Sequence, residues 1–234
     1  MEARGRDVWK RALAAGRLPL KVCCIRDANE ARLAARVGAS AVGLVGPMPS
    51  GPGTLSDDAI ASVVPEVPPD VLGVLLTCEH TVDGVLAHLR RTGTRALQLT
   101  APLAPGVLRD LRLALPEVWI AAVVHVEDER AIDEARELAR DGADAVLLDS
   151  GRPSASVPEL GGTGRVAISR RVVEATPVPV LLAGGLGPEN VAEAWREVTP
   201  AGLDVCSGLR PGAERALDEG RLIRFVERMR GAVA

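Results

Sequence analysis

Two residues whose types suit proton transfer, Cys23 and Asp149, each stand at the end of a short apolar run. In parallel α/β folds, side chains at the C-terminal ends of inner strands line the active site. If both side chains face one cavity, the carboxyl group can protonate one substrate atom while the thiolate takes a proton from another. The alternative is that Cys23 is a small buried apolar residue and Asp149 a cap. As a pair at strand ends, the two residues favour the chemical interpretation.

Two glycine-containing turns follow later apolar runs and are suited to hold an anion. Gly184-Gly185 follows one run, and Ser207-Gly208 follows the next. Glycine lets backbone N–H groups approach a phosphate closely, and the loops after the last two strands of an eight-stranded parallel barrel often bind one. We therefore expect a phosphorylated ligand at these turns.

The scaffold that must position these residues is visible in the hydrophobic pattern. Short β-rich runs alternate with amphipathic helical patterns, and residues such as Asp27 and Ser56 are placed to cap helices. Strands are predicted over residues 20–25, 41–45, 71–76, 96–99, 119–124, 145–149, 178–183 and 202–205. This order predicts an α/β fold with a single (β/α)8 TIM barrel domain over residues 19–234. Residues 1–18 are predicted to form an N-terminal helical extension that closes the bottom of the barrel.

Composition excludes several classes of partner. The chain has 234 residues, a net charge of −3, very few aromatic residues and dispersed arginines, so we expect no nucleic-acid partner. Because no apolar run approaches membrane-spanning length and no secretory signal is visible, we expect a cytoplasmic protein without a membrane partner. A monomer or a homodimer is expected.

The cysteines lack the paired spacing of a disulfide framework or a zinc site. They stand at positions 23, 24, 78 and 206, which predicts reduced thiols in a cytosolic protein. Side chains alternate along a strand, so Cys24 is predicted to point away from the pocket, into the packing between strand and helix. A structural role is expected for it.

The histidines bear on a rival interpretation, a phosphosugar epimerase of the kind that recruits metal-binding His and Asp residues. His80 and His88 are predicted at the surface, and only His125 is placed to face the barrel mouth. One histidine does not make a metal site. We therefore expect neither a metal nor an organic cofactor.

Five motifs together resemble one enzyme family. They are KVCCIRD at 21–27, LLDS at 147–150, GGTG at 161–164, LAGGLGPENV at 182–191 and DVCSG at 204–208. In this order they are similar to the motifs of phosphoribosylanthranilate isomerase, a TIM-barrel enzyme of tryptophan biosynthesis, and the resemblance covers about residues 20–230. It implies an Amadori rearrangement that converts an N-linked aminoaldose phosphate to an aminoketose phosphate without a cofactor.

The resemblance also implies roles for individual residues. Cys23 matches the general base that takes the proton from C2 of the sugar, and Asp149 matches the general acid that protonates the ring oxygen. The turns at Gly184-Gly185 and Ser207-Gly208 match the phosphate cradle. A further phosphate-site motif, matching the family's mobile lid, consists of Gly162, Thr163 and Gly164.

Departures from the family pattern cluster on the side that would hold the aromatic amine. Cys24 stands where Gly is usual, Thr100 where His is usual and Ala121 where Lys is usual, and the 49–56 loop lacks the family's arginine. The candidate contacts to the aglycone are Arg26, Gln98 and Arg210, with Arg152 and Arg165 as further arginines.

Three functions are consistent with this pattern. The first is the family's isomerase reaction on phosphoribosylanthranilate. The second is the same reaction on a related phosphoribosyl amine in specialised metabolism. The third is a barrel that binds a sugar phosphate without isomerase activity, which the retention of both Cys23 and Asp149 argues against.

Overall fold

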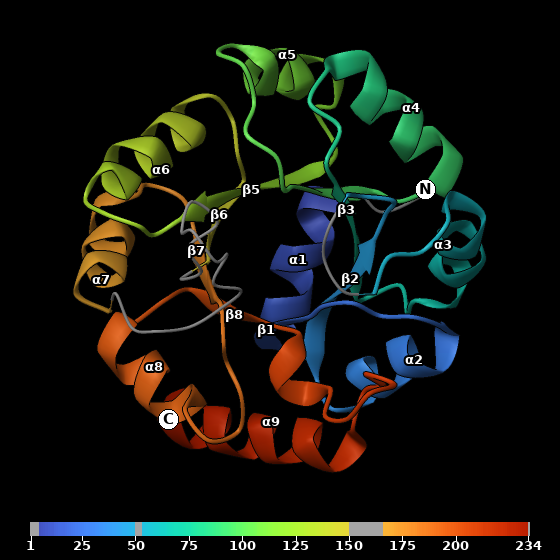
Figure 1. The fold of residues 1–234 in the computed structure, drawn as a ribbon, viewed down its shortest axis with the longest axis vertical. Coiled ribbons are helices and arrows are strands. Elements are labelled where there is room, and N and C mark those ends of the chain that lie inside the picture. The colour runs from blue at the N-terminus through green and yellow to red at the C-terminus, as the bar shows by residue number, and fades with distance from the viewer. Residues whose placement is uncertain (1–4, 50–52, 150–165, 234) are drawn as a thin grey trace.

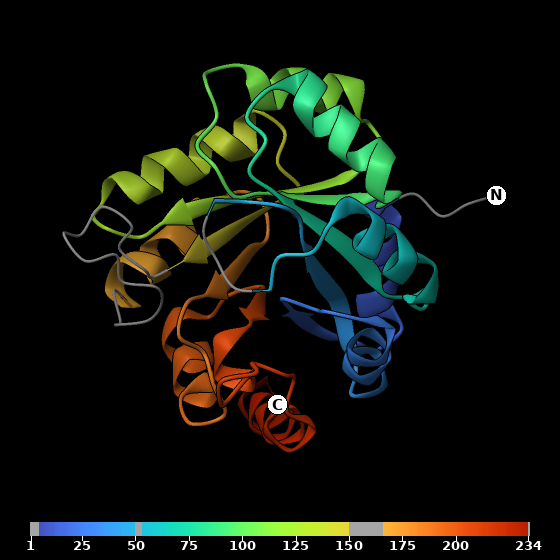
Figure 2. The same ribbon diagram turned by 45° about the vertical axis from the view of Figure 1, so that its right-hand side comes forward.

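The computed structural model describes residues 5–49, 53–149 and 166–233. In this part of the chain, parallel strands form a closed barrel in the order β1 to β8, and helices surround it (Figures 1 and 2). The strands are β1 Leu18–Val22, β2 Ala39–Val45, β3 Leu72–Thr77, β4 Ala96–Leu99, β5 Trp119–His125, β6 Ala145–Asp149, β7 Val180–Ala183 and β8 Gly202–Val205. The α-helices are α1 Gly5–Ala14, α2 Ala28–Arg36, α3 Asp57–Val63, α4 Val82–Thr92, α5 Val107–Ala114, α6 Arg130–Arg140, α7 Val166–Ala175, α8 Val191–Val198 and α9 Glu219–Val233. Short 3-10 helices cover Val64–Glu66 and Ser207–Leu209. The predicted TIM barrel is confirmed.

The strands lie where the sequence pattern predicts them, with shifts of a few residues at some ends. Strands β4, β6 and β8 have the predicted bounds, whereas β1 begins at Leu18 and ends at Val22. Cys23 therefore lies one residue beyond its strand, although its backbone N–H still donates to the Val205 carbonyl at 2.8 Å. The barrel closes through this pairing of β1 with β8.

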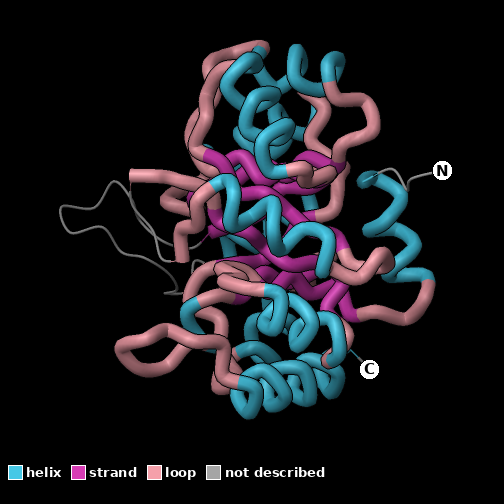
Figure 3. Tube along the Cα trace, turned by 90° about the vertical axis from the view of Figure 1, so that its right-hand side faces the viewer, coloured by secondary structure: helices cyan, strands magenta, loops and turns pink. Residues whose placement is uncertain are grey.

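The N-terminal helix α1 packs across one end of the barrel (Figure 3). Val8 and Trp9 join a buried cluster with residues of six strands, β2 to β7. The rings of Trp9 and Trp119 are 5.7 Å apart between centroids. This apolar plug at the N-terminal ends of the strands leaves the C-terminal ends for the functional site.

A second apolar layer fills the space between the barrel and the surrounding helices. It is aliphatic apart from Phe225, because Leu, Val, Ile and Ala supply nearly all of its buried residues. Local caps set the helix starts: the Asp27 carboxylate accepts from Asn29 N and Glu30 N, and the Ser56 hydroxyl accepts from Ala59 N. No helix in the described ranges is long and apolar enough to cross a bilayer.

His88 lies in the interior, so the prediction of a surface histidine is wrong. Its side chain is 3% exposed, and Nδ1 lies 2.8 Å from the Thr77 hydroxyl. Its Nε2 lies 3.1 Å from the Asp57 carboxylate. The buried face of α4 consists of Val85, His88, Leu89 and Thr92, whose helical spacing places His88 toward the barrel. His80 is exposed, as predicted.

Candidate active site

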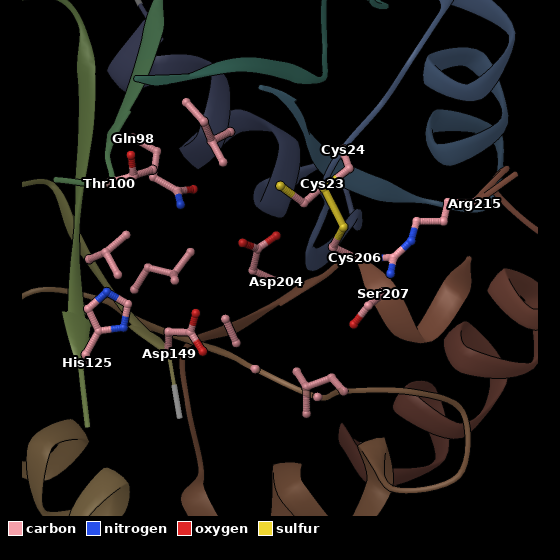
Figure 4. A pocket seen from close by; sticks show the side chains of 17 residues that line it. Cys23, Cys24, Gln98, Thr100, His125, Asp149, Asp204, Cys206, Ser207 and Arg215 are labelled. Carbon is pink, nitrogen blue, oxygen red and sulfur yellow. A yellow bond between two sulfur atoms is a disulfide. The ribbon is translucent and has the colours of Figure 1, made fainter. Parts of the chain in front are cut away.

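A cavity of about 410 Å³ opens at the C-terminal ends of the strands (Figure 4). Cys23 and Asp149 both line it, the first after β1 and the second at the end of β6. In Figure 4 the Cys23 sulfur points toward the centre of the cavity. The structure thus brings the two predicted chemical groups to one space from different strands.

Behind Cys23 lies a buried ion pair that connects β1 and β8. Lys21 and Asp204 are register partners, and Lys21 Nζ lies 2.8 Å from Asp204 Oδ2. Lys21 is 1% exposed, so its charge can persist there only because a carboxylate compensates it. The other oxygen of Asp204, Oδ1, is buried without a hydrogen-bond partner in the described structure, and Asp204 lines the cavity.

The ion pair acts on the protonation of the thiol. Burial raises the pKa of Cys23, whereas the Lys21 ammonium, through its charge and a hydrogen bond, works to lower it. Burial would favour a neutral amine at Lys21, but the charges of Asp204 and Cys23 outweigh it and raise the Lys21 pKa. Lys21 therefore places a cation beside a thiol whose pKa burial raises above its ordinary value.

Gly43 on β2 makes room for both side chains. A Cβ atom at this position would lie 2.8 Å from Cys23 Sγ and 3.1 Å from Lys21 Nζ. Any larger residue would push the thiol or the ammonium out of place. Sequence patterns did not single out Gly43, because the requirement arises from an adjacent strand.

The side of the cavity formed by β4, β5 and β6 combines apolar residues with a few polar ones. Gln98 is 4% exposed, and its Oε1 is buried without a hydrogen-bond partner in the described residues. His125 is the register partner of Asp149 and also lines the cavity, as its place after the fifth strand predicted. In the described part of the chain, no group of three or more His, Cys, Asp and Glu side chains is arranged to hold a metal ion.

Cys24 and Cys206 form a disulfide, which overturns two predictions (Figure 4). Their Cα atoms are 6.0 Å apart, and both residues line the cavity. These cysteines are therefore not reduced thiols, and Cys24 does not point into the packing between strand and helix. The reason is that Cys24 has φ of +60°, a left-handed conformation that ends strand alternation at this residue. The same φ explains why a glycine suits this position in the family pattern.

The two glycine turns lie beside one another at the cavity, as expected. Gly184 and Gly185 have φ of +88° and +61°, and a side chain at Gly208 would collide with the Leu186 carbonyl. The backbone N–H groups of Gly184, Gly185 and Ser207 donate to no acceptor in the described structure. They are therefore available to an anion.

Two side chains that sequence reasoning missed support these turns. The Asn190 side chain donates to the Gly185 carbonyl at 3.0 Å. The Arg221 Nε donates to the Gly208 carbonyl at 2.7 Å, and its Nη2 lies 2.9 Å from Glu189. The turns are thus held from the starts of α8 and α9. Asn190 belongs to a motif that was visible, but Arg221 carried no signal.

Arg26 and Arg210 are engaged away from the cavity. Arg210 is 6% exposed, with its Nη2 2.8 Å from Glu30 Oε2 and 3.2 Å from the Cys23 carbonyl. Arg26 Nε lies 3.2 Å from Glu30 Oε1. Neither arginine lines the cavity, whereas Gln98 does. Burial of the Glu30–Arg210 pair is the physical reason that Arg210 does not face a ligand.

The remaining sequence candidates lie outside the described residues. They are Arg152, Gly162, Thr163, Gly164 and Arg165. The cavity residues that sequence reasoning missed include Asp204 and Arg215.

The chain is similar in sequence and in fold to known enzymes. The protein-family model of N-(5'-phosphoribosyl)anthranilate (PRA) isomerase matches residues 20–223 of the chain. The N-(5'-phosphoribosyl)anthranilate isomerase of Methanosarcina acetivorans is 33% identical over 226 residues, covering 90% of this chain and 92% of the relative. The crystal structure of phosphoribosyl anthranilate isomerase from Thermotoga maritima superposes with a TM-score of 0.78 at 24% identity, covering 92% of this chain and 99% of that one. A structure of a phosphoribosyl anthranilate isomerase in complex with reduced 1-(o-carboxyphenylamino)-1-deoxyribulose 5-phosphate gives a TM-score of 0.76 at 23% identity, covering 92% of this chain and 99% of that one.

Proposed function

The chain belongs to the PRA isomerase family of aldose–ketose isomerases, and from this premise we propose that Cys23 is its general base and Asp149 its general acid. The observation that carries the proposal is that both side chains line one cavity, together with two glycine turns whose N–H groups are available. The substrate is N-(5'-phosphoribosyl)anthranilate, and the product is the corresponding aminoketose phosphate.

The acid step begins the reaction. Asp149, in its protonated form, gives its proton to the ring oxygen of the ribose, and the C1–O bond breaks as the amine nitrogen forms an iminium ion. The position of Asp149 at the last residue of β6 supports this role, because a strand end holds a side chain at the cavity with little freedom. His125, its register partner, lies beside it at the same edge.

The base step uses Cys23. The iminium ion acidifies the proton on C2, which the Cys23 thiolate removes to give an enolamine. Return of this proton from the Cys23 thiol to C1, and transfer of the enol proton from the C2 oxygen to the Asp149 carboxylate, give the ketone. Cys23 is then again a thiolate and Asp149 is again protonated. A thiol serves as a base only as its thiolate, and two cations favour that form: the fixed ammonium of Lys21 and the transient iminium ion.

The two sides of the cavity suit the two halves of the substrate. The phosphate is bound by Gly184, Gly185, Ser207 and Gly208, to which the family motif adds Gly162, Thr163 and Gly164 as further candidates. Leu76, Val123 and Leu147 give the cavity apolar surface for an aromatic ring. Gln98 adds a buried acceptor there, which fits the N–H of the anthranilate amine.

Steady-state assay of the purified chain tests the proposed substrate. We expect turnover of N-(5'-phosphoribosyl)anthranilate without added metal or cofactor, and slower turnover of phosphoribosyl amines that lack the aromatic carboxylate. A higher kcat/KM for one of those amines would assign the chain to a related substrate. Binding of sugar phosphates without turnover of any of them would contradict isomerase activity.

A further inference from the structure

The charged residues that line the cavity include acidic side chains and a cation without a partner in the described structure. Among the described lining residues, Asp149 and Asp204 are acidic, and Arg215 is the cation. Lys21 lies behind Asp204 and is already paired with it. A phosphorylated sugar brings about two negative charges at neutral pH, so Arg215 is the side chain in the described cavity that best compensates them.

Arg215 lies at the phosphate side of the cavity. In Figure 4 its guanidinium points toward Ser207 and the Cys206 end of the disulfide, far from Gln98 and His125. The side chain is exposed at the cavity rim. In the described structure it has no carboxylate partner, in contrast to Arg26 and Arg210, which both pair with Glu30. Its donors are therefore available to a ligand.

A buried network holds the backbone of Arg215 in place. Its φ is +48°, a left-handed conformation that a residue other than glycine adopts only where contacts fix it. Arg210 Nη1 donates to the Arg215 carbonyl at 3.1 Å, and the Leu217 N–H donates to Glu30 Oε1 at 3.0 Å. The Arg26 Nη1 donates to the Glu214 carbonyl at 2.9 Å. Arg26 holds the segment before Arg215, and the Glu30–Arg210 pair holds Arg215 itself and the segment after it.

We propose that Arg215 binds the phosphate group of the substrate, adding a bidentate charged contact to the backbone N–H groups of the two glycine turns. The inference rests on the proposed function for the identity of the sugar phosphate, but the binding of the anion itself does not require turnover. It also gives the buried Glu30–Arg210 pair a role, which is to present Arg215 to the ligand.

Binding of inorganic phosphate, measured by ³¹P NMR titration, tests the proposal. We expect Arg215→Gln to weaken phosphate binding about tenfold. Arg215→Lys should weaken it less, because lysine keeps the positive charge but cannot make the bidentate contact of a guanidinium group. The matched control Arg196→Gln removes an exposed arginine of α8 and should bind as the wild type does. Far-UV circular dichroism checks that each variant is folded.

Free anthranilate is the second probe, since it carries a carboxylate and no phosphate. Its dissociation constant should be unchanged by Arg215→Gln. An Arg215→Gln protein that binds phosphate within twofold of the wild type would overturn the proposal. Wild-type protein that binds no phosphate would overturn it too, as would an Arg215→Gln protein that loses affinity for anthranilate alone. Phosphate binding that depends on Arg215 in a chain without isomerase turnover would uphold the site while contradicting the proposed function.

Discussion

Cys24 and Cys206 are joined by a disulfide although 182 residues separate them in sequence. The bond ties the residue that follows the proposed base to the residue that precedes Ser207 of the phosphate turn. It crosses the β1–β8 seam, where the barrel closes. The two halves of the proposed site, base and phosphate cradle, are therefore covalently connected.

Reduction of this bond should lower the free energy of unfolding by about 2–5 kcal/mol, because the reduced unfolded chain regains the conformational freedom of a very long loop. Urea unfolding with and without a phosphine reductant measures the difference. The variant Cys206→Ser should not respond to the reductant, whereas Cys78→Ser, which removes a free thiol, should respond as the wild type does. Equal midpoints for oxidised and reduced wild type would contradict this expectation.

The Lys21 ammonium should set the reactivity of Cys23. Because Lys21 lowers the pKa of the thiol and Asp204 raises it, the pKa should be higher in Lys21→Met than in wild type. The double variant Lys21→Met/Asp204→Asn should fall between them. Alkylation requires the thiolate, so a higher pKa moves the alkylation profile to higher pH and slows the reaction at neutral pH.

Iodoacetamide labelling of Cys23 across pH, followed by mass spectrometry, gives these profiles. Cys78 is the internal reference, since it is a free and partly exposed thiol whose profile should be the same in all three proteins. Labelling of Cys23 in Lys21→Met at the same or lower pH than in wild type would show that the ammonium does not act on the thiol.

The Glu30–Arg210 pair should make stability depend on acid pH. Burial alone would raise the pKa of Glu30, but hydrogen bonds from Arg210 and Leu217 N outweigh it and hold the pKa below its ordinary value of 4.5. A carboxyl group with a lowered pKa stabilises the fold above its unfolded pKa, and this contribution is lost as the pH falls through the folded pKa.

Replacement Glu30→Gln leaves Arg210 buried without its counter-charge, so unfolding should become easier by about 3–5 kcal/mol at pH 7. The difference from wild type should shrink as the pH falls below 4.5. Urea unfolding at several pH values measures it. The control Glu66→Gln breaks an exposed pair with Arg32 and should cost less than about 1 kcal/mol at any pH. A difference between wild type and Glu30→Gln that does not vary with pH would refute the linkage.

Local patterns were sufficient for the barrel and for much of the site. Alternation and glycine placement gave the strands β4, β6 and β8 with their bounds, and they brought Cys23, Asp149 and both glycine turns to one cavity. These features depend on residues near one another in sequence. The expected monomer or homodimer stays a prediction.

Features that depend on contacts between residues distant in sequence could not be predicted from local patterns. The positive φ of Cys24 ends the alternation of side chains along the strand. Cys24 therefore forms a disulfide with Cys206 and does not pack between strand and helix as predicted. Arg210 has the type of a ligand-binding residue, but burial against Glu30 uses its donors, and Arg215 lies at the cavity instead. The burial of His88, in contrast, could have been predicted, because it shares the helical spacing of the other buried residues of α4.

The central claim is that Cys23 and Asp149 are the base and the acid of one isomerisation. Its most direct test is kcat for N-(5'-phosphoribosyl)anthranilate in Cys23→Ala and Asp149→Asn, with Cys78→Ala as the control. We predict that each of the two site variants loses about 10²–10⁴-fold in kcat. Both should still bind reduced 1-(o-carboxyphenylamino)-1-deoxyribulose 5-phosphate, and the control should turn over normally. A Cys23→Ala or Asp149→Asn enzyme within a few-fold of wild-type kcat would contradict the account.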